Sequence, residues 1–129
     1  MATSKKLGVG RLLIAVYAIF AVSASARALY QIATKFQDAP IAYALSALSA
    51  LVYVVATISL TRSTASAAKL AKATIWFELV GVVVVGTLSF LAPDWFKHPT
   101  VWSEFGIGYG LIPLILPILG LLWLRKRGG

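Results

Sequence analysis

The chain has 129 residues, with no cysteine, one histidine, 12 basic and 4 acidic residues, and 60% of its residues are hydrophobic. Soluble domains carry charge on about 25% of their residues, whereas this chain does so on 12%, in short clusters between long uncharged segments. These proportions exclude most soluble classes, and the lack of cysteine excludes disulfide and thiol chemistry.

Four apolar segments follow one another along the chain, and each is long enough to cross a bilayer once. A helix needs roughly 20 residues to span about 30 Å of hydrocarbon. The expected spans are residues 12–33, 41–60, 73–92 and 105–124. The sequence therefore predicts an all-α fold, an integral membrane four-helix bundle in which residues 1–129 form a single transmembrane domain.

Basic residues collect in alternate connections between the spans and predict the orientation. They precede the first span, separate the second from the third and follow the fourth: Lys5, Lys6, Arg11, Arg62, Lys69, Lys72, Arg125, Lys126 and Arg127. Positively charged flanks stay on the cytoplasmic side, so we expect both termini inside. No lipidation motif or organelle address is present, which favours a bacterial plasma membrane. The basic rims would attract anionic lipids, and their placement argues against nucleic-acid binding.

The first span, residues 12–33, has a second interpretation. Its basic start, its apolar stretch and the Ala-Ser-Ala triplet at 24–26 are typical of a cleaved secretory signal. Apolar residues resume after Arg27, however, and we therefore expect an uncleaved span.

Stripes of small or polar residues predict which helix faces turn toward other helices. In the first two spans these stripes are Ser23, Arg27 and Gln31, and Ser46, Ser49 or Ala50, Tyr53 and Thr57. Arg27 lies about 8 Å below the outer boundary. We expect Arg27 to join the first span to the start of the fourth through Tyr109 or Glu104. The alternative is an arginine that extends to the lipid headgroups.

Glu78 is the one acidic residue within the four predicted spans. At helical rise it lies about 8 Å below the cytoplasmic boundary, and an ionisable residue at that depth is a candidate for proton relay, ion passage or cation binding. Tyr17, Tyr53 and Thr57 lie at comparable depth and predict a small polar pocket, with Gly120 opposite. The structural alternative is an ion pair between Glu78 and an arginine at the inner interface. The arginines available are Arg11, Arg62 and Arg125.

The fourth span carries five glycines and prolines on what would be one helix face. Gly106, Gly110, Pro113, Pro117 and Gly120 recur at spacings of 4, 3, 4 and 3 residues, which predicts a groove for close helix packing, or for a lipid chain or small apolar ligand.

Proline at 113 would free the carbonyl of Tyr109 and kink this helix between the two residues. Ser103 is expected to cap the helix, with Glu104 in its first turn. The four tryptophans are expected in the headgroup zones: Trp76, Trp95, Trp102 and Trp123.

Motifs for catalysis or metal binding are weak. Asp94, His98 and Glu104 do not form a convincing metal site, because prolines interrupt the local helix. Residues 106–110 resemble the filter of potassium channels, yet glycine replaces its threonine and no acid follows. We expect no cofactor, no metal and no enzymatic activity.

Two segments carry a resemblance to known proteins. Residues 77–82 (Phe-Glu-Leu-Val-Gly-Val) and 100–110, with the Leu-Ile-Pro-Leu-Ile-Leu-Pro that follows, resemble short four-span integral membrane proteins common in actinobacteria. The resemblance implies a bacterial membrane protein and implies no activity. Small multidrug transporters have a similar length, but they place their working glutamate in the first span, where this chain has none.

Two functions follow as expectations. The first is a non-catalytic accessory or scaffolding subunit that binds another membrane protein, or itself, through the glycine-proline face of the fourth span and the small-residue faces of the first two. The alternative is a small dimeric transporter or lipid-handling protein in which Glu78 is the proton or cation site.

Overall fold

The computed structural model describes residues 2–35, 37, 40–62, 64–96 and 102–127. These residues form helices and connections, without a strand. The elements are α1 (Ala2–Lys35), α2 (Pro40–Thr61), α3 (Ala65–Leu91), the 3-10 helices η2 (Pro93–Phe96) and η3 (Ser103–Tyr109), and α4 (Ile112–Arg127). The all-α expectation is confirmed for the described part of the chain.

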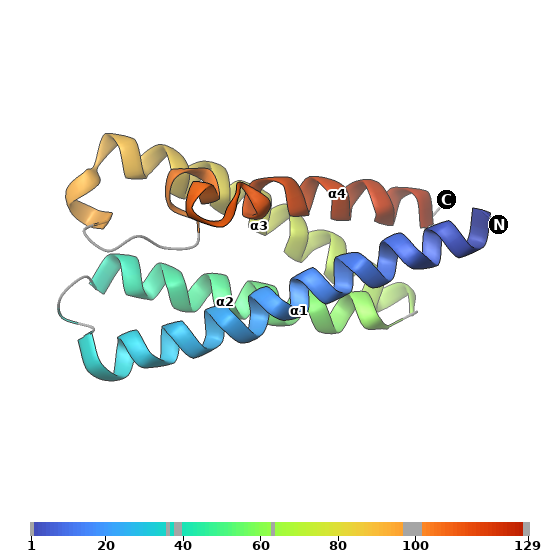
Figure 1. Ribbon diagram of the computed structural model, residues 1–129, viewed down its shortest axis with the longest axis horizontal. Coiled ribbons are helices and arrows are strands. Elements are labelled where there is room, and N and C mark those ends of the chain that lie inside the picture. Colours follow the sequence, from blue (N-terminus) through green and yellow to red (C-terminus); the bar gives the residue numbers. More distant parts are fainter. Residues whose placement is uncertain (1, 36, 38–39, 63, 97–101, 128–129) are drawn as a thin grey trace.

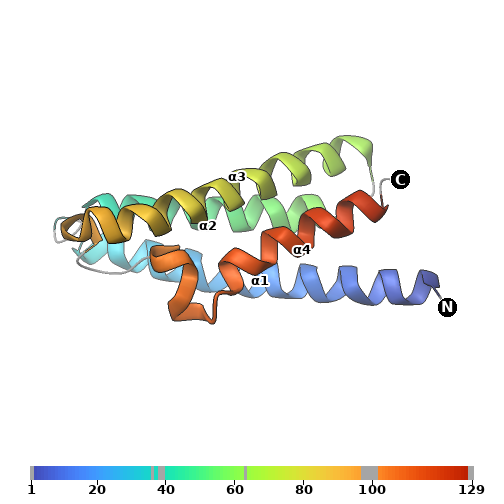
Figure 2. The ribbon, with the colours of Figure 1, turned by 90° about the horizontal axis from the view of Figure 1, so that it is seen from above.

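Helices α1, α2 and α3 are each long and apolar enough to cross a membrane, and η3 with α4 adds a fourth candidate span if the bent pair is counted as one. The three long helices run lengthwise beside one another (Figures 1 and 2). The start of α1, the link between α2 and α3 and the end of α4 lie at one end of the molecule (Figure 1). We call this the basic end, because all three basic segments meet there.

Helix α3 begins eight residues before the expected third span. The hydroxyl oxygen of Thr64 accepts the backbone N–H of Ala67 at 3.1 Å, and this N-cap satisfies one of the otherwise unpaired donors of the first turn. Residues 65–72 are rich in alanine, the strongest helix former, and extend the helix beyond the apolar span. The two lysines expected in a loop, Lys69 and Lys72, therefore lie on the helix.

The expected continuous helix over residues 105–124 is wrong. The axes of η3 and α4 differ by 96°, and the backbone turns through left-handed conformations at Glu104, Phe105 and Gly106, with φ of 52°, 62° and 80°. Gly110, with φ of 67°, ends η3 in the conformation that glycine adopts without steric cost. The break separates Gly106 and Gly110 from the prolines of α4, so the predicted five-residue groove on one helix face does not form.

Pro113 lies in the first turn of α4, where a missing N–H costs no helical hydrogen bond. The expected cause of a free Tyr109 carbonyl, a proline inside a continuous helix, is therefore absent at Pro113. The change of direction does occur between Tyr109 and Pro113, as expected, but it is a break between two helices instead of a kink in one. At the start of η3, Trp102 and not Ser103 occupies the N-cap position, with no capping side-chain bond.

Aromatic rings pack onto glycines where the helices meet. Trp123 of α4 covers Gly10 of α1, and Phe105 of η3 covers Gly86 of α3, so closely that a Cβ atom at either glycine would clash. The outer surface carries large apolar side chains, among them Val22, Leu29 and Leu91, which are 72%, 71% and 76% exposed. Such a surface, apolar toward the surroundings, suits lipid and not water.

Candidate functional site

Glu78 lies near the middle of α3 and is completely buried. The hydroxyl of Tyr17, on α1, donates to its Oε1 atom at 2.7 Å. The other carboxyl oxygen, Oε2, is buried and has no hydrogen-bond partner among the described residues. Buried polar atoms nearly always have partners, so half of this carboxyl group is left unsatisfied.

A second buried pair extends this polar core. The indole Nε1 of Trp102 donates to the hydroxyl oxygen of Tyr53 at 3.0 Å, and the Tyr53 ring lies 6.2 Å from that of Tyr17 between centroids. All three aromatic side chains are buried. We call Glu78, Tyr17, Tyr53 and Trp102 the polar core; it joins α1, α2, α3 and the residue before η3.

Trp102, which we expect in a headgroup zone, is buried within the protein. Gly81, three residues after Glu78 on α3, leaves the space for the ring: a Cβ at this position would lie 2.6 Å from Cζ3 of Trp102. The indole N–H then has a buried acceptor in Tyr53, which removes the need for contact with water. Trp76 is half exposed and Trp123 partly so, while the side chain of Trp95 lies outside the described part.

Three of the four expected pocket residues come together. Glu78, Tyr17 and Tyr53 do so, whereas the hydroxyl of Thr57 donates to the Tyr53 carbonyl at 2.7 Å, within its own helix. Gly120 of α4 lies opposite, as expected, since a Cβ at this glycine would lie 3.5 Å from the Tyr17 hydroxyl oxygen. The core is thus closed on the α4 side by a residue without a side chain.

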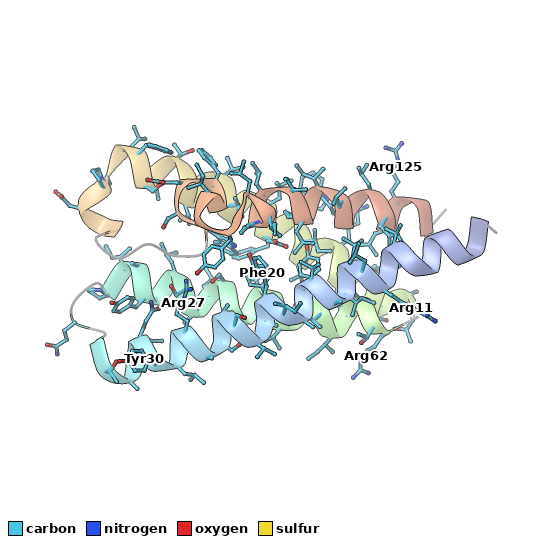
Figure 3. All side chains as sticks on the ribbon, viewed as in Figure 1. Arg11, Phe20, Arg27, Tyr30, Arg62 and Arg125 are labelled. Carbon is cyan, nitrogen blue, oxygen red and sulfur yellow. The ribbon has the colours of Figure 1, made fainter. Side chains whose placement is uncertain are left out.

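The expected ion pair between Glu78 and an arginine is absent from the described residues. The three arginines considered, Arg11, Arg62 and Arg125, are exposed. Figure 3 shows them pointing outward near the basic end. Glu78 instead lies inside the bundle with Tyr17 as its partner, because a carboxyl on the inward face of α3 cannot reach these outward side chains.

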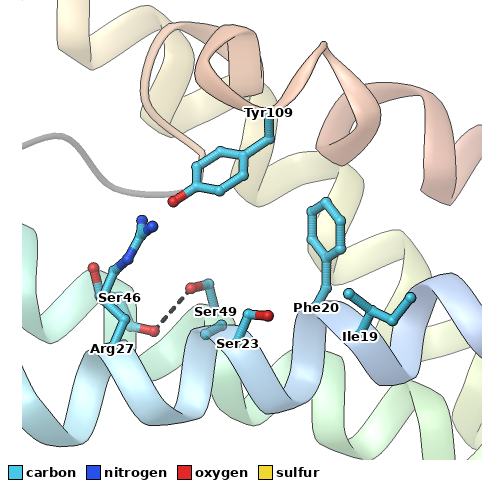
Figure 4. Close-up of a pocket in the computed structure, with 8 residues that line it drawn as sticks. Ile19, Phe20, Ser23, Arg27, Ser46, Ser49 and Tyr109 are labelled. Carbon is cyan, nitrogen blue, oxygen red and sulfur yellow. Dashed lines mark hydrogen bonds between the residues drawn. The ribbon is translucent and has the colours of Figure 1, made fainter.

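A pocket of about 170 Å³ lies between α1, α2 and η3 (Figure 4). We call it the arginine pocket. Its lining residues are Ile19, Phe20, Ser23, Ala24, Arg27, Ser46, Ser49 and Tyr109. The small-residue stripes predicted on the first two spans therefore meet here, at least through their serines and Arg27.

Arg27 contacts Tyr109, the expected partner, through the ring and not through the carbonyl. Its guanidinium carbon lies 5.1 Å from the ring centroid, a distance typical of a cation–π contact. Glu104, the other expected partner, is held elsewhere: its backbone N–H donates to the Ser89 hydroxyl oxygen of α3 at 2.9 Å. In this way α1 is joined to the C-terminal end of η3 and α3 to its start.

Phe20 separates the arginine pocket from the polar core. Its ring contacts that of Tyr53 edge-on, with centroids 5.3 Å apart, and lies 6.1 Å from that of Tyr109. One aromatic side chain of α1 therefore contacts both sites. Sequence reasoning did not single out Phe20, because an apolar ring in an apolar span carries no pattern of its own.

Among the described residues, no three His, Cys, Asp or Glu side chains are grouped closely enough to hold a metal ion. His98, considered above with Asp94 and Glu104, lies outside the described residues. No protein-family profile, curated protein or solved structure matches the chain. The geometry of the two sites is therefore the basis for the function proposed next.

Proposed function

We propose that this chain is a multi-pass protein of the bacterial plasma membrane. In this proposal α1, α2 and α3 each cross once and the bent η3–α4 segment completes a fourth crossing, with both termini in the cytoplasm. Exposed apolar side chains along the helices support the membrane location. The meeting of all basic segments at one end supports the orientation (Figure 1).

The proposed activity is transport or lipid handling, with Glu78 as a proton or cation site. The observation that carries this proposal is the buried Oε2 atom of Glu78, which has no hydrogen-bond partner in the part of the chain that the structure describes. A carboxylate charge that is removed from water and left unpaired costs several kcal/mol. A proton or a bound cation must therefore accompany it, and ionisable groups inside membrane bundles commonly serve such roles.

The broken fourth segment also supports transport. Non-helical backbone at membrane depth is tolerated where protein buries it or where it lines a cavity, and transporters place binding sites at discontinuous helices. In this chain η3 lies partway along the bundle (Figure 2), and Tyr109 at its end lines the arginine pocket. Trp102, immediately before η3, contacts the polar core.

Two parts of the sequence-based expectation change. One of the surfaces expected for the scaffolding role, the glycine-proline helix face, is divided by the bend; the small-residue faces of the first two spans remain available to that role. The dimeric form of the transporter is not required, since one chain encloses Glu78 completely. An accessory role, acting through another membrane protein, is the competing proposal that the experiment must separate.

The test uses the purified full chain in proteoliposomes on a solid-supported membrane, with rapid jumps in pH, Na⁺ or K⁺. We expect a transient current in response to at least one of these ions, lost in Glu78→Gln. Glu104→Gln is the matched control, because Glu104 is exposed and lies outside the polar core. Currents that are absent from the wild type, or unchanged in Glu78→Gln, would overturn the proposal and favour an accessory role.

A further inference from the structure

The arginine pocket has features that the proton or cation site does not explain. Arg27 lies on the half of α1 away from the basic end (Figure 3), and no carboxylate pairs with it in the described part of the chain. Tyr109 contacts the guanidinium through its ring. The guanidinium is thus an exposed cation over the Tyr109 ring that pairs with no carboxylate of the described residues.

The geometry at Arg27 suits an oxyanion. The contact with Tyr109 places the guanidinium over the ring, and a guanidinium carries five N–H donors, more than one ring can engage. These donors form a fork that matches the two oxygens of a carboxylate or phosphate. Tyr109 therefore positions the charge and leaves donors for an oxyanion.

Apart from Arg27 and three serines, the lining of the pocket is aliphatic and aromatic. Figure 4 shows Arg27 and Ser46 at one end and Ile19 and Phe20 at the other. The hydroxyl of Ser49 donates to the carbonyl oxygen of Ser46 at 2.8 Å, so that hydroxyl is already engaged within α2. A molecule that fits must place an anionic group at one end and an apolar portion at the other.

We propose that the arginine pocket binds an anionic lipid, with the headgroup oxyanion on Arg27 and an apolar chain against Ile19 and Phe20. As an assignment of the transported or handled substrate this rests on the proposed function, whereas binding itself does not. Phe20 contacts both the pocket and Tyr53, so an occupant of the pocket would press on the polar core that holds Glu78.

Native mass spectrometry of the full chain in a neutral detergent tests this proposal. The probes are phosphatidylglycerol, oleate, the neutral lipid phosphatidylcholine and inorganic phosphate. We expect phosphatidylglycerol and oleate to bind in preference to phosphatidylcholine, with Arg27→Gln weakening both anionic lipids by at least about tenfold, the loss expected for a charge-assisted hydrogen-bonded pair. Inorganic phosphate should bind far more weakly, because it lacks the apolar portion.

Four variants show whether the pocket itself is responsible for lipid binding. Arg125→Gln removes a charge at the basic end, away from the pocket (Figure 3), and should leave affinity within about twofold. Tyr109→Phe keeps the ring and should bind like the wild type, whereas Tyr109→Leu should bind more weakly. Arg27→Lys keeps the charge and controls for a folding defect. Its affinity for anionic lipid should lie between those of the wild type and Arg27→Gln, because lysine lacks the forked donors of arginine.

The outcomes decide between the alternatives. If Arg27→Gln binds anionic lipid as tightly as the wild type, or if Arg125→Gln loses as much affinity as Arg27→Gln, the arginine pocket is not the lipid-binding site. Phosphate that binds as tightly as phosphatidylglycerol would overturn the lipid assignment and indicate a simple anion site. If the chain shows no ion-dependent current while Glu78→Gln still binds anionic lipid, that result would support the lipid site and contradict the proposed transport.

Discussion

The hydroxyl of Tyr17 donates to Oε1 of Glu78, 61 residues later in the sequence, at 2.7 Å and thereby joins α1 to α3. The other carboxyl oxygen of Glu78 lies beside this bond with no partner. A polar group at the centre of an apolar bundle is thus half stabilised by the protein, and the unsatisfied half is what a proton or cation would complete.

Removing the Tyr17 hydroxyl tests the hydrogen bond to Oε1 of Glu78. Tyr17→Phe leaves both carboxyl oxygens without a protein donor, so we expect stability to fall by about 1–3 kcal/mol, measured as thermal unfolding in detergent. Tyr109→Phe is the control, because the contact of Tyr109 with Arg27 uses the ring. In a double-mutant cycle with Glu78→Gln the two changes should be non-additive; additive losses would mean that the bond does not contribute.

Filling the space at Gly81 tests the placement of Trp102. A Cβ there would lie 2.6 Å from the indole, so Gly81→Ala should displace the ring and destabilise the fold by about 1–3 kcal/mol through overpacking. Gly8→Ala is the matched control, also within a helix, since a Cβ at Gly8 meets nothing within 4 Å. Unfolding temperatures report both changes, and equal values for the two variants would contradict the buried position of Trp102.

The break between η3 and α4 makes a separate prediction. Gly110 has φ of 67°, a conformation that costs other residues roughly 1–2 kcal/mol. Gly110→Ala should therefore lower the unfolding temperature. Gly108→Ala, two residues earlier, should not, because Gly108 has no positive φ and open space at its Cβ. A continuous helix through these residues would reverse the result, as alanine would then stabilise both positions.

The orientation is tested by cysteine labelling, since the native chain contains no cysteine. Ser66 follows the link between α2 and α3 at the basic end, and Asp94 lies in η2 at the opposite end; both are exposed. In intact cells a membrane-impermeant maleimide should label Asp94→Cys at once and Ser66→Cys only after permeabilisation. The reverse pattern would place the basic end outside the cell.

Much of this architecture is predictable because apolar length and charge placement are local properties of the sequence. The three long helices were expected from hydropathy, and counting residues from the helix ends brought Tyr17, Tyr53 and Gly120 to the level of Glu78. The break between η3 and α4 is less predictable. Glycines at 106, 108 and 110 lower helix propensity, but the regular spacing of glycine and proline favours one continuous, kinked helix.

The contacts of Trp102 and Phe20 were beyond local reasoning. Trp102 is followed by polar residues and resembles a headgroup tryptophan, and only the packing of η3 against α3 places it beside Gly81. Phe20 links the two sites only because Tyr53 and Tyr109 contact it from two other elements. Both positions depend on tertiary packing, which periodicity along one helix does not encode.

Carbodiimide labelling tests the role of Glu78 most directly, because an apolar carbodiimide modifies protonated carboxyl groups that lie in apolar surroundings. In membranes containing the full chain we predict modification at Glu78 and not at Glu104, located by mass spectrometry of peptides. Labelling should slow as the pH rises or, if a cation binds, as Na⁺ or K⁺ is added. A Glu78 that stays unmodified, or reacts at a rate independent of pH and of both cations, would contradict a proton or cation site.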